Sequence, residues 1–528
     1  MRNVFIFVGV CVGICGLALC AFFGYFVWQE MSRPEWERGL AEAGKMEQVD
    51  PKKAIEQYKA VCAKFEKQNL KETDAWTDYG NFLWSAFDFA GAEKVYQQGE
   101  KYANRIGRKG DEAWYLERQA ACQHELVMNG QLEKPDIKLV EKAIATLPAD
   151  TTNFGWYQAR NLETLAQLQL DLGDYKSADG NFDKAVEGYR AAKDERMAVD
   201  ALNWKMDSLL RQNRGNDANK LFIRTWRDHG SASEDDGPAF DVCENFREKI
   251  SDADLRDAGI YPQVRKLIHA GDFAALDKMA TEFRESRKTL STGRWYLDAL
   301  YSEINSLERD QFDDAWIARI DQLKEWSKKS PESVTAKIAL VHVLRGYAWK
   351  ARGSGWANSV SEDGWRVMGE RMNEAETVLN SVETKTPDWY SAAQLVALGQ
   401  SWSNEKYDRM MQECQLKYPD YDSVILAKSY WLQPRWNGEE GDAEKFVESE
   451  AAKRSTVDGD ILYGRCCLWL DRQLGDVFGE TKLQWPRTKK GLLALRGKYP
   501  KSYALSGETS ILAMEKNDMD TATKAFEP

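Results

Sequence analysis

Proline, histidine and paired cysteines are scarce in this chain of 528 residues. It contains 13 Pro and 4 His, and its 9 Cys include no Cys-x-x-Cys pair. A low proline content together with 30% charged residues favours helices. Because histidines and paired cysteines are so few, the chain offers few ligands for a structural zinc site. A net charge of −12 argues against the basic stripe that a nucleic-acid-binding protein needs. We therefore predict no metal, no cofactor and no nucleic-acid partner.

The sequence also lacks the motifs of common catalytic sites. It has no phosphate loop, no Gly-x-Ser-x-Gly elbow, no Rossmann fingerprint and no EF-hand loop. His124-Glu125 has no second histidine one turn further on, so it is not a zinc-protease helix. The isolated histidines are predicted to be surface or capped groups, and the isolated cysteines to be small core residues. We predict no catalytic residue and a non-enzymatic protein.

One long apolar run stands at the N-terminus. Residues 4–28 carry no charged side chain, and about 18 apolar residues suffice for a transmembrane helix. A cleaved signal peptide needs a shorter apolar core followed by a small-x-small site, but here the run continues past the weak match at Ala18-Leu19-Cys20. Residues 1–30 are therefore predicted to be an uncleaved, single-pass anchor in the cell (inner) membrane.

The charges that flank this anchor leave its orientation open. Arg2 precedes the run, whereas Arg33, Arg38 and Lys45 follow it among acidic residues, and cytoplasmic flanks are usually the more basic. Because only a few residues precede the span and a long domain follows it, we predict that the domain lies outside the cytoplasm. The alternative is that the domain lies on the cytoplasmic side.

Small residues at helical spacing form one face of the predicted span. This face either packs against a second copy of the helix, giving self-association, or reflects how common glycine is in membrane helices. Its residues are Gly9, Gly13, Gly16, Cys20 and Gly24.

Beyond Lys45, apolar residues recur at helical spacing and are separated by short turns. The clearest unit has Trp-x-x-Tyr-Gly-x-x-Leu from Trp76 to Leu83, followed by small and aromatic positions at Phe89, Ala92, Tyr96 and Gly99. It resembles the tetratricopeptide repeat, whose first helix carries Trp-x-x-Leu-Gly-x-x-Tyr and whose second carries alanine and then an aromatic. The small residues let two helices approach closely, and the aromatics fill the gap to the next pair.

Further units repeat this pattern with decreasing fidelity. The closest match comprises Leu165, Ala166, Leu170, Gly173, Asp174, Tyr175, Ala178, Phe182 and Ala185. A weaker one comprises Trp204, Leu209, Ala218 and Phe222, and traces occur near residues 54–58, 140–148 and 513–526. We therefore predict an all-α fold, a tetratricopeptide-like α-solenoid of roughly a dozen helical hairpins, with one N-terminal transmembrane helix.

The polar, acidic segment of residues 231–238 ends in Gly-Pro and is the best candidate for an internal break. It divides the chain into predicted regions after the anchor. These are N-terminal repeats at 31–230, an acidic linker and connecting helix at 231–262, a distinct helical region at 263–450 and C-terminal tetratricopeptide-like helices at 451–528.

Residues from about 260 to 450 carry a second set of motifs, rich in aromatics. The motifs are Phe273-x-x-Leu276-Asp277, Phe283-Arg284, Trp295, residues 349–355, Gly364-Trp365, residues 387–390, residues 400–402, Pro419-x-Tyr421 and residues 434–438. This region resembles a bacterial family defined only as a domain of unknown function and built of tetratricopeptide-like helices. The resemblance implies a fold and no activity.

Residues 349–365 are the most site-like stretch. Gly353 suits a left-handed cap for a helix that ends at Arg352, and Ser359 with Glu362 fits a capping box for the next helix. The segment is either a structural inter-helix loop, which we favour, or a loop that grips a carboxylate or an extended peptide. The candidate ligand or partner residues are Trp349, Arg352, Gly353, Gly355, Trp356, Asn358 and Trp365.

Tryptophan is abundant, with 20 residues. We predict that most of them fill the space between stacked helices, because large residues do so in solenoids. Those in apolar, periodic contexts are Trp76, Trp84, Trp204, Trp326, Trp349, Trp402 and Trp469. Several indoles on one exposed surface would instead indicate a glycan-binding groove.

The leading functional hypothesis is a membrane-anchored, non-enzymatic scaffold that binds another protein or peptide on its concave face. The acidic balance weakly favours a basic or neutral partner. The alternatives are an envelope glycan-binding module that uses exposed aromatics, and an enzyme with an unrecognised site near residues 349–365. The last unit has no obvious polar capping helix, so we expect a partner or a second copy to cover its apolar face.

Overall fold

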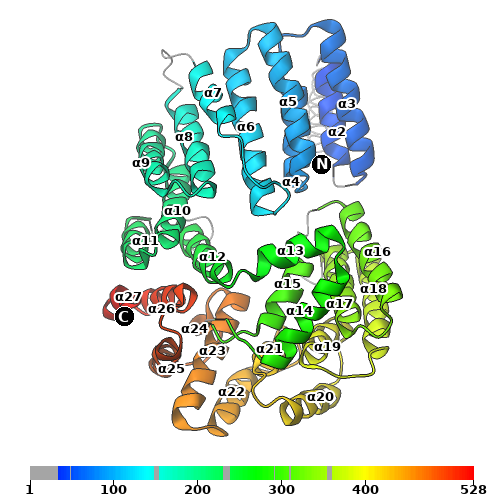
Figure 1. The fold of residues 1–528 in the computed structure, drawn as a ribbon, viewed down its shortest axis with the longest axis vertical. Helices are drawn as coiled ribbons and strands as arrows, with labels where there is room; N and C mark the ends of the chain where they lie inside the picture. The colour runs from blue at the N-terminus through cyan, green and yellow to red at the C-terminus, as the bar shows by residue number, and fades with distance from the viewer. Residues whose placement is uncertain are drawn as a thin grey trace, which may run out of the picture. The chain divides into compact units, whose positions relative to one another are not determined.

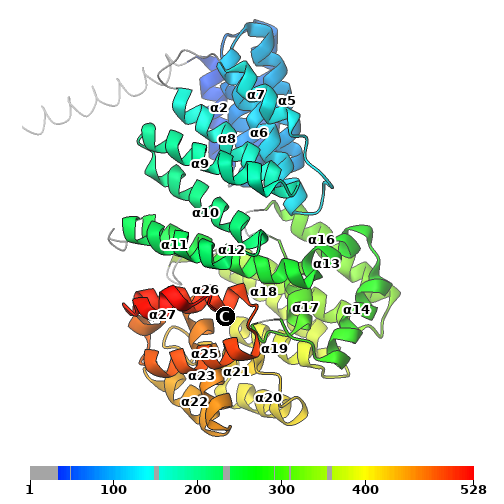
Figure 2. The same cartoon turned by 60° about the vertical axis from the view of Figure 1, so that its left-hand side comes forward.

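A computed structural model describes residues 34–47, 49–147, 154–229, 238–290, 292–307, 311–353 and 359–527 (Figures 1 and 2). These residues form helices and turns, with one isolated β-bridge between Thr289 and Trp295, so the predicted all-α fold is confirmed for them. Within these ranges, no helix combines the length and the apolar character needed to cross a membrane. The predicted span at 4–28 and its small-residue face lie outside the described residues.

The chain divides into two compact units. One comprises Met1–Gln123 and Lys138–Ala149, and the other comprises His124–Ile137 and Asp150–Pro528. This division falls close to residue 150 and not within the segment 231–262 that the sequence suggests as a linker.

The helices of the first unit are α2 (Glu35–Met46), α3 (Pro51–Gln68), α4 (Asp74–Ser85), α5 (Phe89–Ile106), most of α6 (Lys109–Met128) and α7 (Lys138–Thr146). Within this unit, α2 packs on α3, α3 on α4 and α4 on α5. The hairpin α4–α5 is the predicted clearest repeat. A Cβ at Gly80 would overlap the ring of Tyr96, and one at Gly99 would overlap the ring of Tyr115. The glycines therefore permit the close helix approach that the repeat pattern implies.

The second unit begins with two hairpins and a long helix. These are α8 (Phe154–Asp171) with α9 (Tyr175–Ala191), α10 (Glu195–Arg211) with α11 (Gly215–His229), and α12 (Pro238–Ala258). Ala166, Ala178 and Phe182 are fully buried between α8 and α9, as the repeat pattern predicts. Helix α12 packs against α10 and α11 and buries Phe246 and Ile250, so it forms part of the hydrophobic core.

Most of the remaining helices of the second unit surround one large hydrophobic core. In chain order the remaining helices are α13 (Ile260–Ala270), α14 (Phe273–Ser286), α15 (Tyr296–Ile304), α16 (Asp313–Lys329), α17 (Val334–Arg352), α18 (Glu362–Asn380), α19 (Pro387–Gln400), α20 (Asn404–Lys417), α21 (Ser423–Trp431), α22 (Asp442–Ala452), α23 (Thr456–Leu474), α24 (Val477–Glu480), α25 (Trp485–Lys498), α26 (Tyr503–Glu515) and α27 (Met519–Lys524). Helices α26 and α27 instead bury most of their apolar residues in the core shared with α10, α11 and α12.

One turn recurs between successive helices. A residue with positive φ is followed by an aspartate whose side chain accepts a hydrogen bond from the backbone N–H three residues later. The aspartate N–H in turn donates to the carbonyl five residues earlier, which closes a Schellman motif. The pairs are Phe87-Asp88, Gly173-Asp174, Lys193-Asp194, Gly271-Asp272 and Asn517-Asp518. The same short turn thus ends one helix and caps the next throughout the chain.

The chain returns at its C-terminal end to cover the helices near its middle. Helix α26 packs on α12, and α27 packs on α11 (Figure 2). Asp254 of α12 accepts hydrogen bonds from Ser502 Oγ at 2.6 Å and from Tyr503 N at 2.8 Å, and Asn219 Nδ2 of α11 donates to the carbonyl of Ala522 at 3.0 Å.

This arrangement corrects an expectation from the sequence. The apolar face of the last unit was expected to need a partner or a second copy, but α11 and α12 of the same chain cover it. Phe526 lies 6.4 Å from Phe246 and 6.2 Å from Tyr503 between ring centroids. The contacts from α26 and α27 to α11 and α12 join residues at least 248 positions apart, so no local pattern revealed them.

Candidate functional site

The segment 349–365 has the predicted helix boundaries but different caps. Helix α17 ends at Arg352, and Gly353 follows with φ 77° and ψ −175°. The positive φ was predicted, but the backbone leaves in an extended direction and does not form a left-handed helical cap. The cap of α18 is Ser361, whose Oγ accepts from Gly364 N at 3.0 Å, and not Ser359 as predicted.

Ser361 is the cap because it stands immediately before the first helical residue, where its hydroxyl can reach the exposed N–H groups of the first turn. Three predicted residues, Gly355, Trp356 and Asn358, lie outside the described residues.

The structure brings three of the predicted residues together. The guanidinium of Arg352 lies 5.7 Å from the ring of Trp349 and 5.6 Å from the ring of Trp365. Trp349 also meets Trp436 edge to face, with centroids 6.0 Å apart. Cation–π contacts of this kind hold an arginine over aromatic faces. Arg352, Trp349 and Trp365 therefore form one cluster, which we call the indole–arginine cluster.

Trp365 is the exposed member of this cluster. Of the 18 tryptophans among the described residues, it alone is exposed, at 42%. Trp76 and Trp326 are fully buried, and Trp84, Trp204, Trp349, Trp402 and Trp469 are partly buried. Most tryptophans thus serve packing, and the described indoles do not gather on one exposed surface.

A buried polar network, which was not predicted, lies within the same region. Arg284 of α14 donates to both carboxylate oxygens of Asp388 of α19, from Nε at 3.0 Å and from Nη2 at 2.7 Å. Tyr301 OH donates to Asp388 at 2.5 Å, and Arg284 Nη2 also donates to Tyr301 OH at 2.9 Å and to Thr335 Oγ1 at 3.0 Å. The Asp388 side chain is wholly buried.

The electrostatics of this network favour the charged pair. Burial by itself would raise the pKa of Asp388, but the charge and hydrogen bonds of Arg284 outweigh it and hold the pKa below its usual value. His342 stacks on the ring of Tyr301 with centroids 5.1 Å apart. Burial, followed by the nearby charge of Arg345, lowers the pKa of His342 to about 4, so this histidine is neutral at pH 7.

A second buried aspartate links further motif residues. Asp298 of α15 accepts hydrogen bonds from Tyr421 OH and from Ser423 Oγ, the latter at 2.8 Å. Asp277 of α14 accepts from Trp326 Nε1 at 3.1 Å and from Ser333 Oγ at 2.5 Å.

The motif residues Asp277, Arg284, Asp388 and Tyr421 therefore join separate helices through hydrogen bonds. These hydrogen bonds give the charged motif residues a structural role in holding the helices together. The motifs were the signal that could have identified this network, because they place acidic and basic residues at otherwise apolar positions.

The histidines agree only in part with the expectation of surface or capped groups. His269 is exposed, as predicted. His124 differs, because it is buried together with Asp171, with Nδ1 and Oδ2 2.7 Å apart, and His342 is partly buried and stacks on Tyr301. The described cysteines agree better with the prediction, because none forms a disulfide and five of the six are buried. Burial raises the pKa of the Cys62, Cys414 and Cys466 thiols to about 12.

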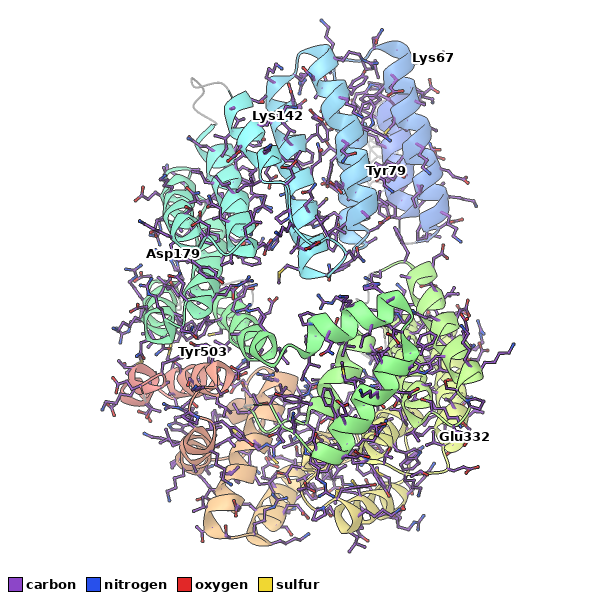
Figure 3. The ribbon with its side chains drawn as sticks, in the orientation of Figure 1. Lys67, Tyr79, Lys142, Asp179, Glu332 and Tyr503 are labelled. Carbon is purple, nitrogen blue, oxygen red and sulfur yellow. The ribbon has the colours of Figure 1, made fainter. Side chains whose placement is uncertain are left out.

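A groove of about 480 Å³ lies between α9, α10 and α11. Asp179 on α9 is one of its lining residues and is labelled in Figure 3. The groove has acidic groups on the α9 side and basic groups on the α11 side, including Lys220 and Arg224. Among the described residues, no cluster of three or more histidine, cysteine or acidic groups is arranged to hold a metal ion.

Residues 261–411 match the family model of a domain of unknown function (DUF4034). They lie within the region whose motifs resemble such a family. The predicted resemblance to a family defined as a domain of unknown function is confirmed for this helical part of the chain. The match gives it no activity.

The other comparisons add little. A chain from the structure of Naa15/Naa10 bound to HypK-THB aligns with 12% identity, over 93% of this chain and 97% of that chain. The TM-score of 0.20 is too low to support an argument about fold or function. No curated protein matches the chain.

Proposed function

We propose that this protein is a non-enzymatic helical-repeat scaffold that binds a partner protein or peptide. The observation that carries the proposal is the indole–arginine cluster, in which Trp365 is the exposed indole among the described tryptophans. Tryptophan and arginine are the side chains most enriched at the energetic centres of protein interfaces. Helical-repeat folds present such groups on extended surfaces, each fixed by the packing beneath it.

Arg352 and Trp365 are well placed to contact a partner. The guanidinium of Arg352 lies beside Trp349, which itself packs on Trp436, so the guanidinium loses little conformational freedom when it binds. An arginine between two indoles can pair with a carboxylate or a main-chain carbonyl of an extended peptide, while Trp365 supplies apolar area. This surface lies on α17 and α18, within the DUF4034 domain.

The scaffold is further proposed to be held at the inner membrane by residues 4–28, with the helical units outside the cytoplasm. The length of the uncharged run supports the anchor. A tag placed after Pro528 tests the orientation in cells whose outer barrier is opened while the inner membrane stays intact. Loss of the tag to added protease is expected, and protection of the tag would place the helical units in the cytoplasm.

Photo-crosslinking tests the partner surface. A benzophenone amino acid at Trp365 is expected to capture a defined protein in cells, and Trp365→Ala is expected to lower recovery of that protein with the tagged chain. The matched control places the benzophenone at Leu493 of α25, which is exposed to 41%. Capture of the same proteins at both positions, or of none at Trp365, would contradict the proposal.

The other two hypotheses have less support. A glycan platform needs several exposed aromatics on one surface, and the described tryptophans other than Trp365 are at least partly buried. An enzyme near residues 349–365 needs a cavity with convergent polar groups. The described cavities lie on α9 to α12 and beside residues 498–502. None of these three cavities is lined by a residue of the segment 349–365.

A further inference from the structure

Helix α11 carries a row of cations on its solvent-exposed face. Lys220, Arg224 and Arg227 are spaced four and three residues apart, so they lie along one side of the helix, and all three are exposed. Within the described part of the chain, none of them takes part in an ion pair or hydrogen bond. Like charges at this spacing destabilise a helix slightly. The helix dipole compensates Arg227 in the last turn, but Lys220 lies in the middle of the helix.

The other charged groups that line the groove are three carboxylates and two cations, which form ion pairs with one another and leave one negative charge over. Lys205 Nζ pairs with Asp183 at 2.5 Å, and Arg214 pairs with Asp217 at 2.9 Å. Asp179 accepts hydrogen bonds from two side chains of α10 at 2.6 and 3.0 Å. The α11 side therefore keeps a local positive charge, although the whole chain has a net charge of −12.

The shape of the groove suits a narrow polypeptide segment. Its volume of about 480 Å³ lies within the range of typical ligand sites. Leu209 and Leu221 give it an apolar floor between the charged walls. Aliphatic stems of acidic side chains can pack on such a floor while their carboxylates reach Lys220 and Arg224.

The spacing of the cations specifies the bound chain further. Residues four apart on a helix are separated by about 6 Å along its axis. In an extended strand, alternate side chains point to the same side and are about 6.6 Å apart. An extended segment with acidic residues at alternate positions therefore places successive carboxylates opposite Lys220 and Arg224, and a third near Arg227.

We propose that the groove between α9 and α11 binds an extended, acidic segment of a partner protein, with acidic residues at alternate positions. This inference rests on the proposed scaffold function and names the chemistry of one partner segment. It concerns a surface separate from the indole–arginine cluster, so the two can fail independently.

The experiment uses the full chain in neutral-lipid nanodiscs and fluorescein-labelled peptides of defined sequence. The probe is acetyl-(Glu-Ser)4-amide, followed by fluorescence anisotropy. One comparison peptide has the same composition as a Glu4Ser4 block, and the other replaces each Glu by Gln. The alternating peptide is expected to bind most tightly, the block peptide several-fold more weakly and the Gln peptide undetectably. Added salt is expected to weaken binding.

Charge reversal tests the residues. The double variant K220E/R224E is expected to weaken binding of the alternating peptide at least about tenfold, because attraction becomes repulsion at both contacts. The matched control K278E/K445E changes the net charge equally, at side chains that are 80% and 77% exposed on α14 and α22, and should bind normally. If circular dichroism shows that K220E/R224E is misfolded, the milder variant K220Q/R224Q takes its place, and it should also weaken binding of the alternating peptide.

Equal binding of the alternating and block peptides would overturn the extended-segment proposal, as would equal weakening by both charge-reversal variants. Binding of added phosphatidylserine vesicles without binding of the peptide would assign the cations to a lipid surface and also overturn it. Partner capture at Trp365 that persists in K220E/R224E would show that the scaffold function stands even where the groove proposal fails.

Discussion

Asp388→Asn is the most informative single change in the DUF4034 domain. The substitution keeps the shape of the side chain but removes the negative charge that receives two hydrogen bonds from Arg284 and one from Tyr301. The Asp388 side chain is wholly buried and that of Arg284 is 14% exposed. The variant therefore leaves a guanidinium charge in the core without its carboxylate.

The expected cost follows from the burial of the pair. Removing one partner of a buried ion pair lowers the free energy of unfolding by about 3–5 kcal/mol, because the remaining charge is desolvated and uncompensated. Tyr301→Phe removes one hydrogen bond to a charged group, and its expected cost is about 1.5–3 kcal/mol. The two effects should not add, because both changes act on the same carboxylate.

Native-state hydrogen–deuterium exchange of the full chain measures this loss within the second unit. Backbone amides of α14, α15 and α19 that exchange by unfolding of the unit should exchange roughly a hundredfold to a few thousandfold faster in D388N, since each 1.4 kcal/mol is a factor of ten. The matched control is Asp420→Asn. Asp420 pairs with Arg287 at 2.9 Å, but both side chains are nearly half exposed, so the expected cost is at most about 1 kcal/mol.

The pH dependence gives a second check on the same reasoning. The pKa of Asp388 is lower in the folded state than in the unfolded state. Its ion pair therefore stabilises the protein above the unfolded pKa of about 4, and this contribution is lost as pH falls through the folded pKa. The difference between the parent protein and D388N should shrink in acid. A D388N variant within 1 kcal/mol of the parent at pH 7 would refute the structural role of the pair.

Three further predictions follow from the packing of single residues. Gly80→Ala should lower the stability of the first unit by about 1–3 kcal/mol, because the new Cβ overlaps Tyr96; Gly44→Ala, with no atom within 4 Å, should be neutral or slightly stabilising, and equal urea midpoints for the two would contradict the close approach. Burial lowers the pKa of His342 in the folded state to about 4. The neutral form therefore stabilises the fold above the unfolded pKa of about 6.5, and about 3 kcal/mol of this stability is lost as the pH falls through the folded pKa. His342→Phe should flatten this part of the plot of unfolding free energy against pH, and an unchanged slope would contradict the prediction. The thiols of Cys62 and Cys466, with pKa values raised to about 12, should resist N-ethylmaleimide until urea unfolds the chain, as peptide mass mapping would show, whereas rapid labelling of the folded chain would contradict their burial.

The sequence by itself determined the local structure of this protein. The spacing of Trp76, Gly80, Ala92 and Tyr96 predicts a close-packed hairpin, because residues three or four apart share one face of a helix. The motif around Gly173-Asp174 predicts a turn that ends one helix and caps the next. These features depend on neighbours within about five residues, and the chain's own order specifies them.

Local patterns were less reliable where two serines competed for the same role. Ser359 and Ser361 both lie ahead of α18, and Ser361 is the cap because the helix begins at Glu362, the residue that follows it. The sequence likewise identified Trp349, Arg352 and Trp365 as candidates, but their contact depends on the relative positions of α17 and α18.

Tertiary structure alone decided the long-range pairings. Arg284 and Asp388 are 104 residues apart, and Asp254 and Ser502 are 248 residues apart. A buried charge must find an opposite charge, but the sequence does not say which of the 156 charged residues supplies it. The tertiary arrangement settles both pairings, because it brings Arg284 of α14 within hydrogen-bond distance of Asp388 of α19, and the packing of α26 on α12 brings Ser502 to Asp254.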